Sequence, residues 1–216
     1  MSHVGMRVSK RPRAPTLTAS MRKLDPAKYR TMSWKNGGGT TTEALTLPAD
    51  AGLDDFELRI SMARVAASGP FSQFHGVDRT LVVTDGAGLT LETADGARVT
   101  LDRDSAPFSF TGDDPVNATL VDGPVTDFNV MTRRKALRHE VRRLSLDADE
   151  ARTFVCSGEL ALLLVLSGTA VARGDVDLSA GDILTVTPED GQVVIEVAMD
   201  TSARPPGWLV VDFFRR

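Results

Sequence analysis

The residues best suited to binding chemistry lie at positions 34–43, WKNGGGTTTE, where an indole, an ammonium group and an amide precede three glycines and three threonines. Three consecutive glycines lose more backbone entropy on folding than an ordinary turn requires, so they indicate a need for positive φ or for close approach of the backbone. A bound ligand is one such need, and a glycine-rich bulge or corner of a β-sheet is the structural alternative.

A second set of polar side chains, further along the chain, suits a small anion. Arg59, Arg79 or Arg133 could bind a carboxylate with paired N–H groups, and an asparagine could form hydrogen bonds with an amide or formyl oxygen. Backbone N–H groups at residues 37–39 would add donors. The alternative for Arg59 is a surface ion pair with Glu57 or Asp78. The expected ligand-binding residues are Trp34, Lys35, Asn36, Gly38, Arg59, Ser61, Phe71, His75, Asn129 and Arg133.

The elements that must position these residues are β-strands. Apolar residues at 56, 58, 60 and 62 alternate with Glu57, Arg59 and Ser61, which is the period-two pattern of a strand with one buried face. Residues 127–133 alternate in the same way, and this pattern places Asn129 and Arg133 on one face. Asp-Gly pairs at 85–86 and 95–96 indicate hairpin turns. Short helices are expected only around residues 26–29 and 148–153.

Composition excludes several classes of protein. The longest apolar run, at 160–166, is too short to span a membrane. The single cysteine permits no disulfide within the chain, and a reducing cytoplasm fits best. Residues 1–23 carry six Lys and Arg and no acid, whereas the whole chain has a net charge of −4. The acidic body therefore argues against a nucleic-acid surface, and residues 1–22 are expected to form a disordered basic tail.

Five blocks of sequence carry a resemblance. WKNGGGTTTE, ELRIS (57–61), GPFSQFHGVDRTL (69–81), PFSF (107–110) and GPVTDFNVMTRR (123–134) are similar to the HutD/Ves family of the cupin superfamily, and the match runs from about residue 24 to the end. The resemblance implies an all-β bicupin, with two jelly-roll-like cupin repeats of β-barrel or sandwich type and few short helices. We expect an N-terminal cupin with a ligand pocket at 23–134 and a mainly structural C-terminal cupin at 135–216.

The metal ligands typical of cupins are incomplete. The spacing from Gly69 to Gly88 matches the first cupin motif, G-x5-H-x-H-x3/4-E-x6-G, and His75 occupies the position of the first ligand. Val77 replaces the second histidine and Leu81 the glutamate. One imidazole does not make a metal site, so neither a metal nor another cofactor is expected.

Three functions remain open. The first is an accessory or regulatory protein that binds a small carboxylate or a formylated amino acid, linked through the resemblance to histidine utilisation or stress response. The second is a metal-independent hydrolase or isomerase with His75 as general base, because the reference pKa of histidine lies near neutrality. The third is a homodimeric interaction module. The first is preferred, without a predicted enzymatic activity and without a nucleic-acid or membrane partner.

Overall fold

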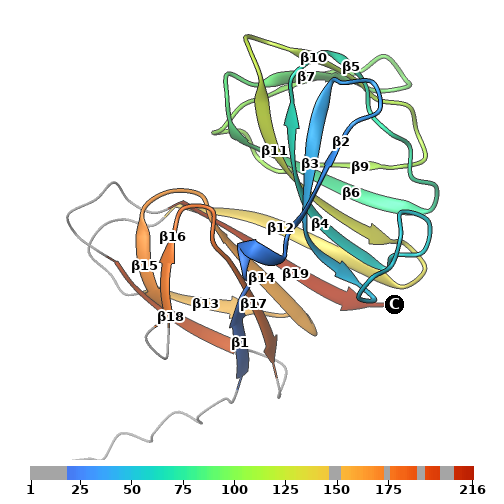
Figure 1. Cartoon of the computed structure of the whole chain (residues 1–216). Coiled ribbons are helices and arrows are strands. Elements are labelled where there is room, and N and C mark those ends of the chain that lie inside the picture. The colour runs from blue at the N-terminus through green and yellow to red at the C-terminus, as the bar shows by residue number, and fades with distance from the viewer. Residues whose placement is uncertain (1–18, 146–151, 173–175, 189–192, 200–206) are drawn as a thin grey trace, which may run out of the picture.

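The computed structural model describes residues 19–145, 152–172, 176–188, 193–199 and 207–216, and over these ranges the chain is almost entirely β (Figure 1). The first two sheets are formed by strands that lie between residues 30 and 133. A six-stranded sheet has the order β2 (Arg30–Ser33), β3 (Gly39–Leu47), β4 (Leu58–Val65), β11 (Val125–Arg133), β6 (Val77–Asp85), β9 (Phe108–Thr111). A four-stranded sheet has the order β5 (Gly69–Pro70), β10 (Asn117–Leu120), β7 (Leu89–Glu92), β8 (Arg98–Leu101).

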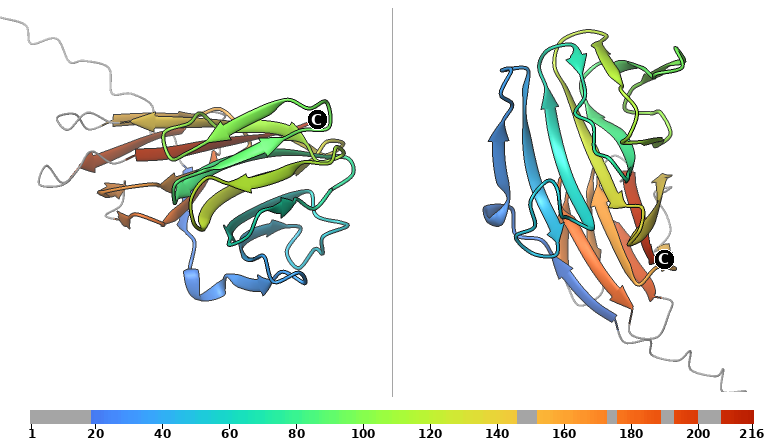
Figure 2. Two further views of the ribbon diagram at one scale, coloured as in Figure 1. Left: turned by 90° about the horizontal axis from the view of Figure 1, so that it is seen from above. Right: turned by 90° about the vertical axis from the view of Figure 1, so that its right-hand side faces the viewer.

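The other two sheets contain the strands of the second half together with the first strand of the chain. A five-stranded sheet has the order β1 (Ala19–Lys23), β17 (Ile183–Pro188), β14 (Leu160–Val165), β19 (Gly207–Arg215), β12 (Leu137–Ser145). The second four-stranded sheet has the order β13 (Arg152–Cys156), β18 (Val193–Met199), β15 (Thr169–Ala172), β16 (Val176–Ser179). In Figures 1 and 2 the green strands gather at one end of the molecule and the orange strands at the other.

The all-β prediction is confirmed. A 3-10 helix, η1 (Pro26–Lys28), forms where a short helix was expected, with Asp25 accepting a hydrogen bond from the backbone N–H of Ala27. The other expected helix falls largely outside the described residues, and its last two positions belong to β13. The described strands pair into four open sheets and not into closed barrels. No helix in the described ranges is long and apolar enough to cross a membrane.

The six-stranded sheet has two chemically different faces, as the alternation in β4 and β11 predicts. Leu58, Ile60, Phe128 and Val130 point to one side, where they join a core with residues of β14, β17 and β19, such as Leu162. This core lies between the six-stranded and the five-stranded sheets. The opposite face carries the polar residues of the same strands, so the apolar core fixes which way those polar residues point.

Part of the segment expected to form a disordered basic tail is a strand, and residues 1–18 of that segment lie outside the described residues. Residues 19–22, which were assigned to the tail, lie in β1 and pair with β17 at the edge of the five-stranded sheet. Lys23 anchors the end of this strand, because its Nζ donates to the carbonyl of Asp177 at 3.0 Å and lies 2.7 Å from a carboxylate oxygen of Asp182. Backbone pairing with an available sheet edge needs little from the side chains, which explains why composition did not reveal this strand.

One of the two expected hairpins is present. Asp95-Gly96 joins β7 to its partner β8, and Gly96 has a φ of +82°. The hairpin expected at Asp85-Gly86 is absent, because β6 and β7 belong to different sheets. Gly86, with a φ of +94°, instead turns the chain from one sheet to the other, where a Cβ atom would lie 2.5 Å from the carbonyl oxygen of Pro124.

Candidate functional site

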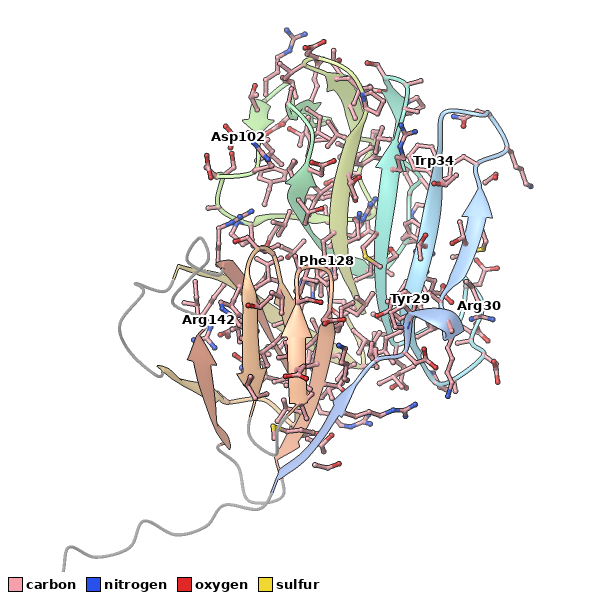
Figure 3. The ribbon with its side chains drawn as sticks, turned by 60° about the vertical axis from the view of Figure 1, so that its left-hand side comes forward. Tyr29, Arg30, Trp34, Asp102, Phe128 and Arg142 are labelled. Atoms are coloured by element: carbon pink, nitrogen blue, oxygen red, sulfur yellow. The ribbon has the colours of Figure 1, made fainter. Side chains whose placement is uncertain are left out.

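The polar face of the six-stranded sheet forms the floor of a pocket of about 550 Å³. Strands β3, β4, β6 and β11 supply the floor, and two segments outside these strands supply the walls. One wall is the turn between β2 and β3, which carries Trp34 (Figure 3). The other wall is the segment after β5, which carries Phe71 and Phe74. The sheet therefore holds the polar groups, and the connecting segments hold the aromatic rings.

The strand register arranges the floor in rows. Met131 on β11 is paired with Arg59 on β4 and with Arg79 on β6, so the two arginines flank one methionine. In the next row Asn129 is paired with Ser61. The two guanidinium groups therefore project from the same face, two strand spacings apart, which is about 10 Å between their Cα atoms.

Arg59 is 4% exposed and is held by a buried carboxylate. Its Nε donates to Oε2 of Glu43 at 2.7 Å, and Oε1 of Glu43 accepts from Nη2 of Arg30 at 2.6 Å. Burial by itself raises the pKa of Glu43, but the hydrogen bonds from the two arginines outweigh it and lower that pKa, so the carboxylate is ionised. The alternative for Arg59, a surface ion pair with Glu57 or Asp78, is therefore wrong.

Part of the Arg59 guanidinium remains available. Its Nη1 reaches only the sulfur of Met131, at 3.9 Å, and its Nη2 has no hydrogen-bond partner among the described residues. A thioether is a weak acceptor compared with a carboxylate. The end of the guanidinium that faces the pocket can therefore accept an anion without breaking the pair with Glu43.

Arg79 is 5% exposed and sits among aromatic rings. Its guanidinium carbon lies 5.6 Å from the ring centroid of Phe71, 5.5 Å from that of Phe74 and 4.8 Å from that of Phe110. Nη1 donates to the carbonyl of Ser72 at 3.0 Å, whereas Nε is buried without a partner. Burial lowers the pKa of Arg79 to about 10. Arg79 was one of three arginines considered as a carboxylate ligand but was not among the expected ligand-binding residues, although its period-two position after Val77 could have indicated its direction.

Asp127 and Asn129 complete the floor. Nη2 of Arg79 donates to Oδ1 of Asn129 at 3.0 Å, and Nδ2 of Asn129 donates to Oδ1 of Asp127. The other oxygen of Asp127 is buried without a partner, and the residue is 1% exposed. Burial raises the pKa of Asp127 to about 7, although Arg79 and Asn129 both act to lower it. The pocket therefore contains a carboxyl group that changes charge near neutrality.

The glycine-rich turn shapes the wall of the pocket. Asn36 accepts a hydrogen bond from the backbone N–H of Gly38 at 3.0 Å, so that donor is already used. Gly37 has a φ of +72°, and a Cβ on Gly39 would collide with the carbonyl oxygen of Arg64 and approach the Trp34 ring to 3.2 Å. The glycines thus allow the backbone to turn and leave space for the indole of Trp34, whose Nε1 donates to Oγ1 of Thr41 at 2.8 Å. The expected use of their N–H groups as ligand donors is wrong at Gly38.

With this geometry established, comparison with known proteins gives the family. The family model HutD matches residues 26–204. The chain belongs to the HutD family. This membership confirms the resemblance to HutD/Ves proteins.

Three relatives support the HutD assignment. A protein Ves from Citrobacter koseri is 38% identical over 162 residues, which are 74% of this chain and 80% of that protein. The structure of HutD from Pseudomonas fluorescens SBW25 is 27% identical, with a TM-score of 0.76, over 91% of this chain and 100% of that one. The structure of a conserved protein of unknown function from Pseudomonas aeruginosa PAO1 is 30% identical, with a TM-score of 0.79, over 90% of this chain and 99% of that one.

More distant structures share the fold alone. An oxalate decarboxylase from Lactobacillus farciminis is 9% identical, with a TM-score of 0.60, over 93% of this chain and 87% of that one. The chain thus has a cupin-like β fold. Among the residues that the structure describes, no group of three or more His, Cys, Asp or Glu side chains is placed to hold a metal ion.

The pocket brings together seven of the ten residues expected from the sequence. These are Trp34, Lys35, Asn36, Arg59, Ser61, Phe71 and Asn129. Three others are elsewhere. Neither Gly38 nor His75 lines the pocket, and the side chain of His75 is 82% exposed, with its Nδ1 3.6 Å from a carboxylate oxygen of Asp113. Arg133 was expected to face inward, but it donates to the carbonyls of Phe56 and Asp54 at 3.0 and 2.7 Å and so braces a loop.

Proposed function

We propose that this protein binds a small carboxylate or a formylated amino acid in the pocket on the six-stranded sheet. The observation that carries the proposal is the state of Arg59, whose Nε is fixed by Glu43 while Nη1 and Nη2 have no oxygen partner among the described residues. A buried guanidinium that is held in place and only partly satisfied is suited to a carboxylate, because charge-assisted hydrogen bonds are the strong ones.

The other residues that line the pocket are suited to a ligand that has a second polar group and an apolar part. Asn129 is fixed at both ends of its amide, by Arg79 and by Asp127, so it presents a defined donor and acceptor. Such an amide complements a formyl or amide group. The rings of Trp34 and Phe71 supply apolar surface above it. A volume of about 550 Å³ is in the range of small-molecule sites.

The biological role that we propose follows the family. The protein acts as an accessory or regulatory protein linked to histidine utilisation or stress response, and it consists of two cupin repeats. The first, at residues 23–134, holds the ligand, and the second, at 135–216, is structural. Catalysis by His75 has no support from its exposed position outside the pocket.

A binding panel tests the proposal. Histidine, urocanate, formiminoglutamate, N-formylglutamate and glutarate are added at millimolar concentration, and the melting temperature and the heat of binding are measured. A ligand at 100 times its dissociation constant adds about 2.7 kcal/mol to the free energy of unfolding. At least one acid of the panel is expected to bind, and binding by none of them would refute the proposal.

Two matched variants locate the site. Arg59→Lys keeps a positive charge beside Glu43 but loses the forked geometry, so it should weaken carboxylate binding about tenfold or more. His75→Ala alters an exposed side chain outside the pocket and should bind as the wild type does. If the acid binds equally well to Arg59→Lys and the wild type, the ligand is not held where we propose.

A further inference from the structure

The buried carboxyl group of Asp127 has a position that the binding of an anion alone does not explain. It lies at the border between the pocket and an apolar core. On β4 it is paired with Ala63, which lines the pocket, and on β6 with Val83, which belongs to a core containing Leu89 and Val125. A carboxylate in this position would repel an anion bound at the arginines, so its presence needs a reason.

Asp127 is connected to the anion-binding groups through a continuous chain of hydrogen bonds. Asn129 donates to Asp127 and accepts from Arg79, whose guanidinium has no carboxylate in direct contact among the described residues. One oxygen of Asp127 and the Nε of Arg79 are both buried and unpartnered. An acid oxygen that is buried without a donor favours the protonated carboxyl group, because burying an unpartnered charge costs more than burying a neutral polar group.

We propose that the pocket binds its anion together with a proton, and that Asp127 takes up this proton. The inference rests on the proposed function, since it requires that an anion binds beside Arg59 and Arg79. Asp127 acts on the ligand through Asn129 and through charge, so it is a positioning residue. The affinity for the anion is accordingly high when Asp127 is neutral and low when it is ionised.

The surrounding charges set the direction of this coupling. The charged residues that line the pocket with Asp127 are Arg59 on β4, Arg79 on β6 and Lys35 in the turn after β2, and Glu43 on β3 holds Arg59. The two strands that pair with β11 carry three further charged residues, Arg64 on β4 and Asp78 and Asp85 on β6, and none of these lines the pocket. Glu43 is neutralised by its pairs with Arg30 and Arg59. An ionised Asp127 offsets the charge of Arg79, whereas a neutral Asp127 leaves that charge for the ligand. An arriving anion therefore favours the protonated form.

The size of the effect follows from the titration of Asp127 in the free protein, where burial raises its pKa to about 7. If only the protein with neutral Asp127 binds the anion, the apparent affinity is proportional to the fraction that is protonated. That fraction falls about tenfold between pH 6 and pH 8, so the affinity falls by up to about tenfold. At pH 7 each binding event should take up about half a proton.

Calorimetry measures the proton directly. N-formylglutamate and glutarate are titrated into the full chain at pH 7 in MOPS and in Tris, which differ in ionisation enthalpy, and the difference between the two heats gives the number of protons taken up. Both probes are fully ionised at this pH, so the proton must come to the protein. The Asp127→Asn variant keeps the shape and an acceptor for Asn129 but cannot titrate, so it should take up no proton and should lose the dependence of affinity on pH.

The outcomes separate this inference from the proposed function. Binding without proton uptake in the wild type overturns the inference and leaves the proposed function standing. Binding by neither probe, nor by any acid of the wider panel, overturns both. If Asp127→Asn does not fold, carboxyl ¹³C resonances of the wild-type protein decide the question: a titration of Asp127 between about pH 6 and 8 that moves upward with the probe supports proton coupling, and a titration near the reference value of about 4 refutes it.

Discussion

Acid should destabilise this protein through one histidine that joins the two halves. His139 on β12 lies between two buried threonines of the six-stranded sheet. Its Nε2 is 2.8 Å from Oγ1 of Thr80 on β6, and its Nδ1 is 2.7 Å from Oγ1 of Thr132 on β11. Hydroxyl groups can donate or accept, so a neutral imidazole is fully satisfied in either tautomer. Burial lowers the pKa of His139 to about 4, against the opposing effect of Asp78.

The sign and size of the effect follow from linkage. The unfolded chain has a histidine pKa of 6.5, so between pH 6.5 and about 4 it binds more protons than the folded protein. The stability contributed by neutral burial is therefore complete above pH 6.5 and is lost as the pH falls toward 4. The difference between the two pKa values corresponds to at most about 3 kcal/mol.

Urea unfolding at pH 7, 6, 5 and 4 measures this loss in the wild type and in His139→Gln and His139→Asn. The variants lack the titrating group, so the stability advantage of the wild type should shrink by about 3 kcal/mol between pH 7 and pH 4. Parallel curves for the wild type and both variants would refute the reasoning. The chain has only three histidines, so NMR can confirm that the resonance lost in the variants does not titrate above about pH 5.

Two further substitutions test the structural roles assigned near the pocket. Gly39→Ala should lower the free energy of unfolding, measured by urea titration, by about 1–3 kcal/mol, because the added Cβ would collide with the carbonyl of Arg64. Gly69→Ala is the control: its Cβ has open space, so it should lower that free energy by less than about 1 kcal/mol. Arg133→Met should lower the free energy of unfolding by about 1–3 kcal/mol and increase proteolysis of the loop at 51–56, because the hydrogen bonds to this loop are lost. Its affinity for acids should stay near that of the wild type. A loss of affinity without a loss of stability would show that Arg133 contributes to ligand binding.

Strand periodicity predicted the floor of the pocket because alternation depends only on local backbone geometry. Arg59 and Ser61 face the pocket and Leu58 and Ile60 face the core, as the pattern at residues 56–62 requires. The same reasoning failed for Arg133, because that residue ends β11 and its long side chain turns toward the carbonyls of a neighbouring loop. Alternation predicts the direction of a side chain inside a strand but not at its last residue.

The partners of the polar residues could not be predicted, because they depend on which strands become neighbours. Glu43 reaches Arg59 only because β3 pairs with β4 and the register shifts between Glu43 and Leu45. His75 was selected from the spacing of a cupin motif, which gives its position along the chain. The spacing does not give the direction of a loop side chain, and Gly76, with a φ of +71°, follows it at the turn that leaves His75 exposed.

The second half of the chain has a consequence for binding at the pocket of the first half. Its strands β14, β17 and β19 cover the apolar face of β4 and β11, and a shift of either strand by one residue would bury Arg59 or Asn129 in that core. Burying an unpaired guanidinium costs far more than any single contact gains, so the register is strongly fixed. The two arginines are thereby held on either side of Met131 before a ligand arrives. Because this position is fixed in advance, little ordering is needed on binding, which favours affinity for a small anion.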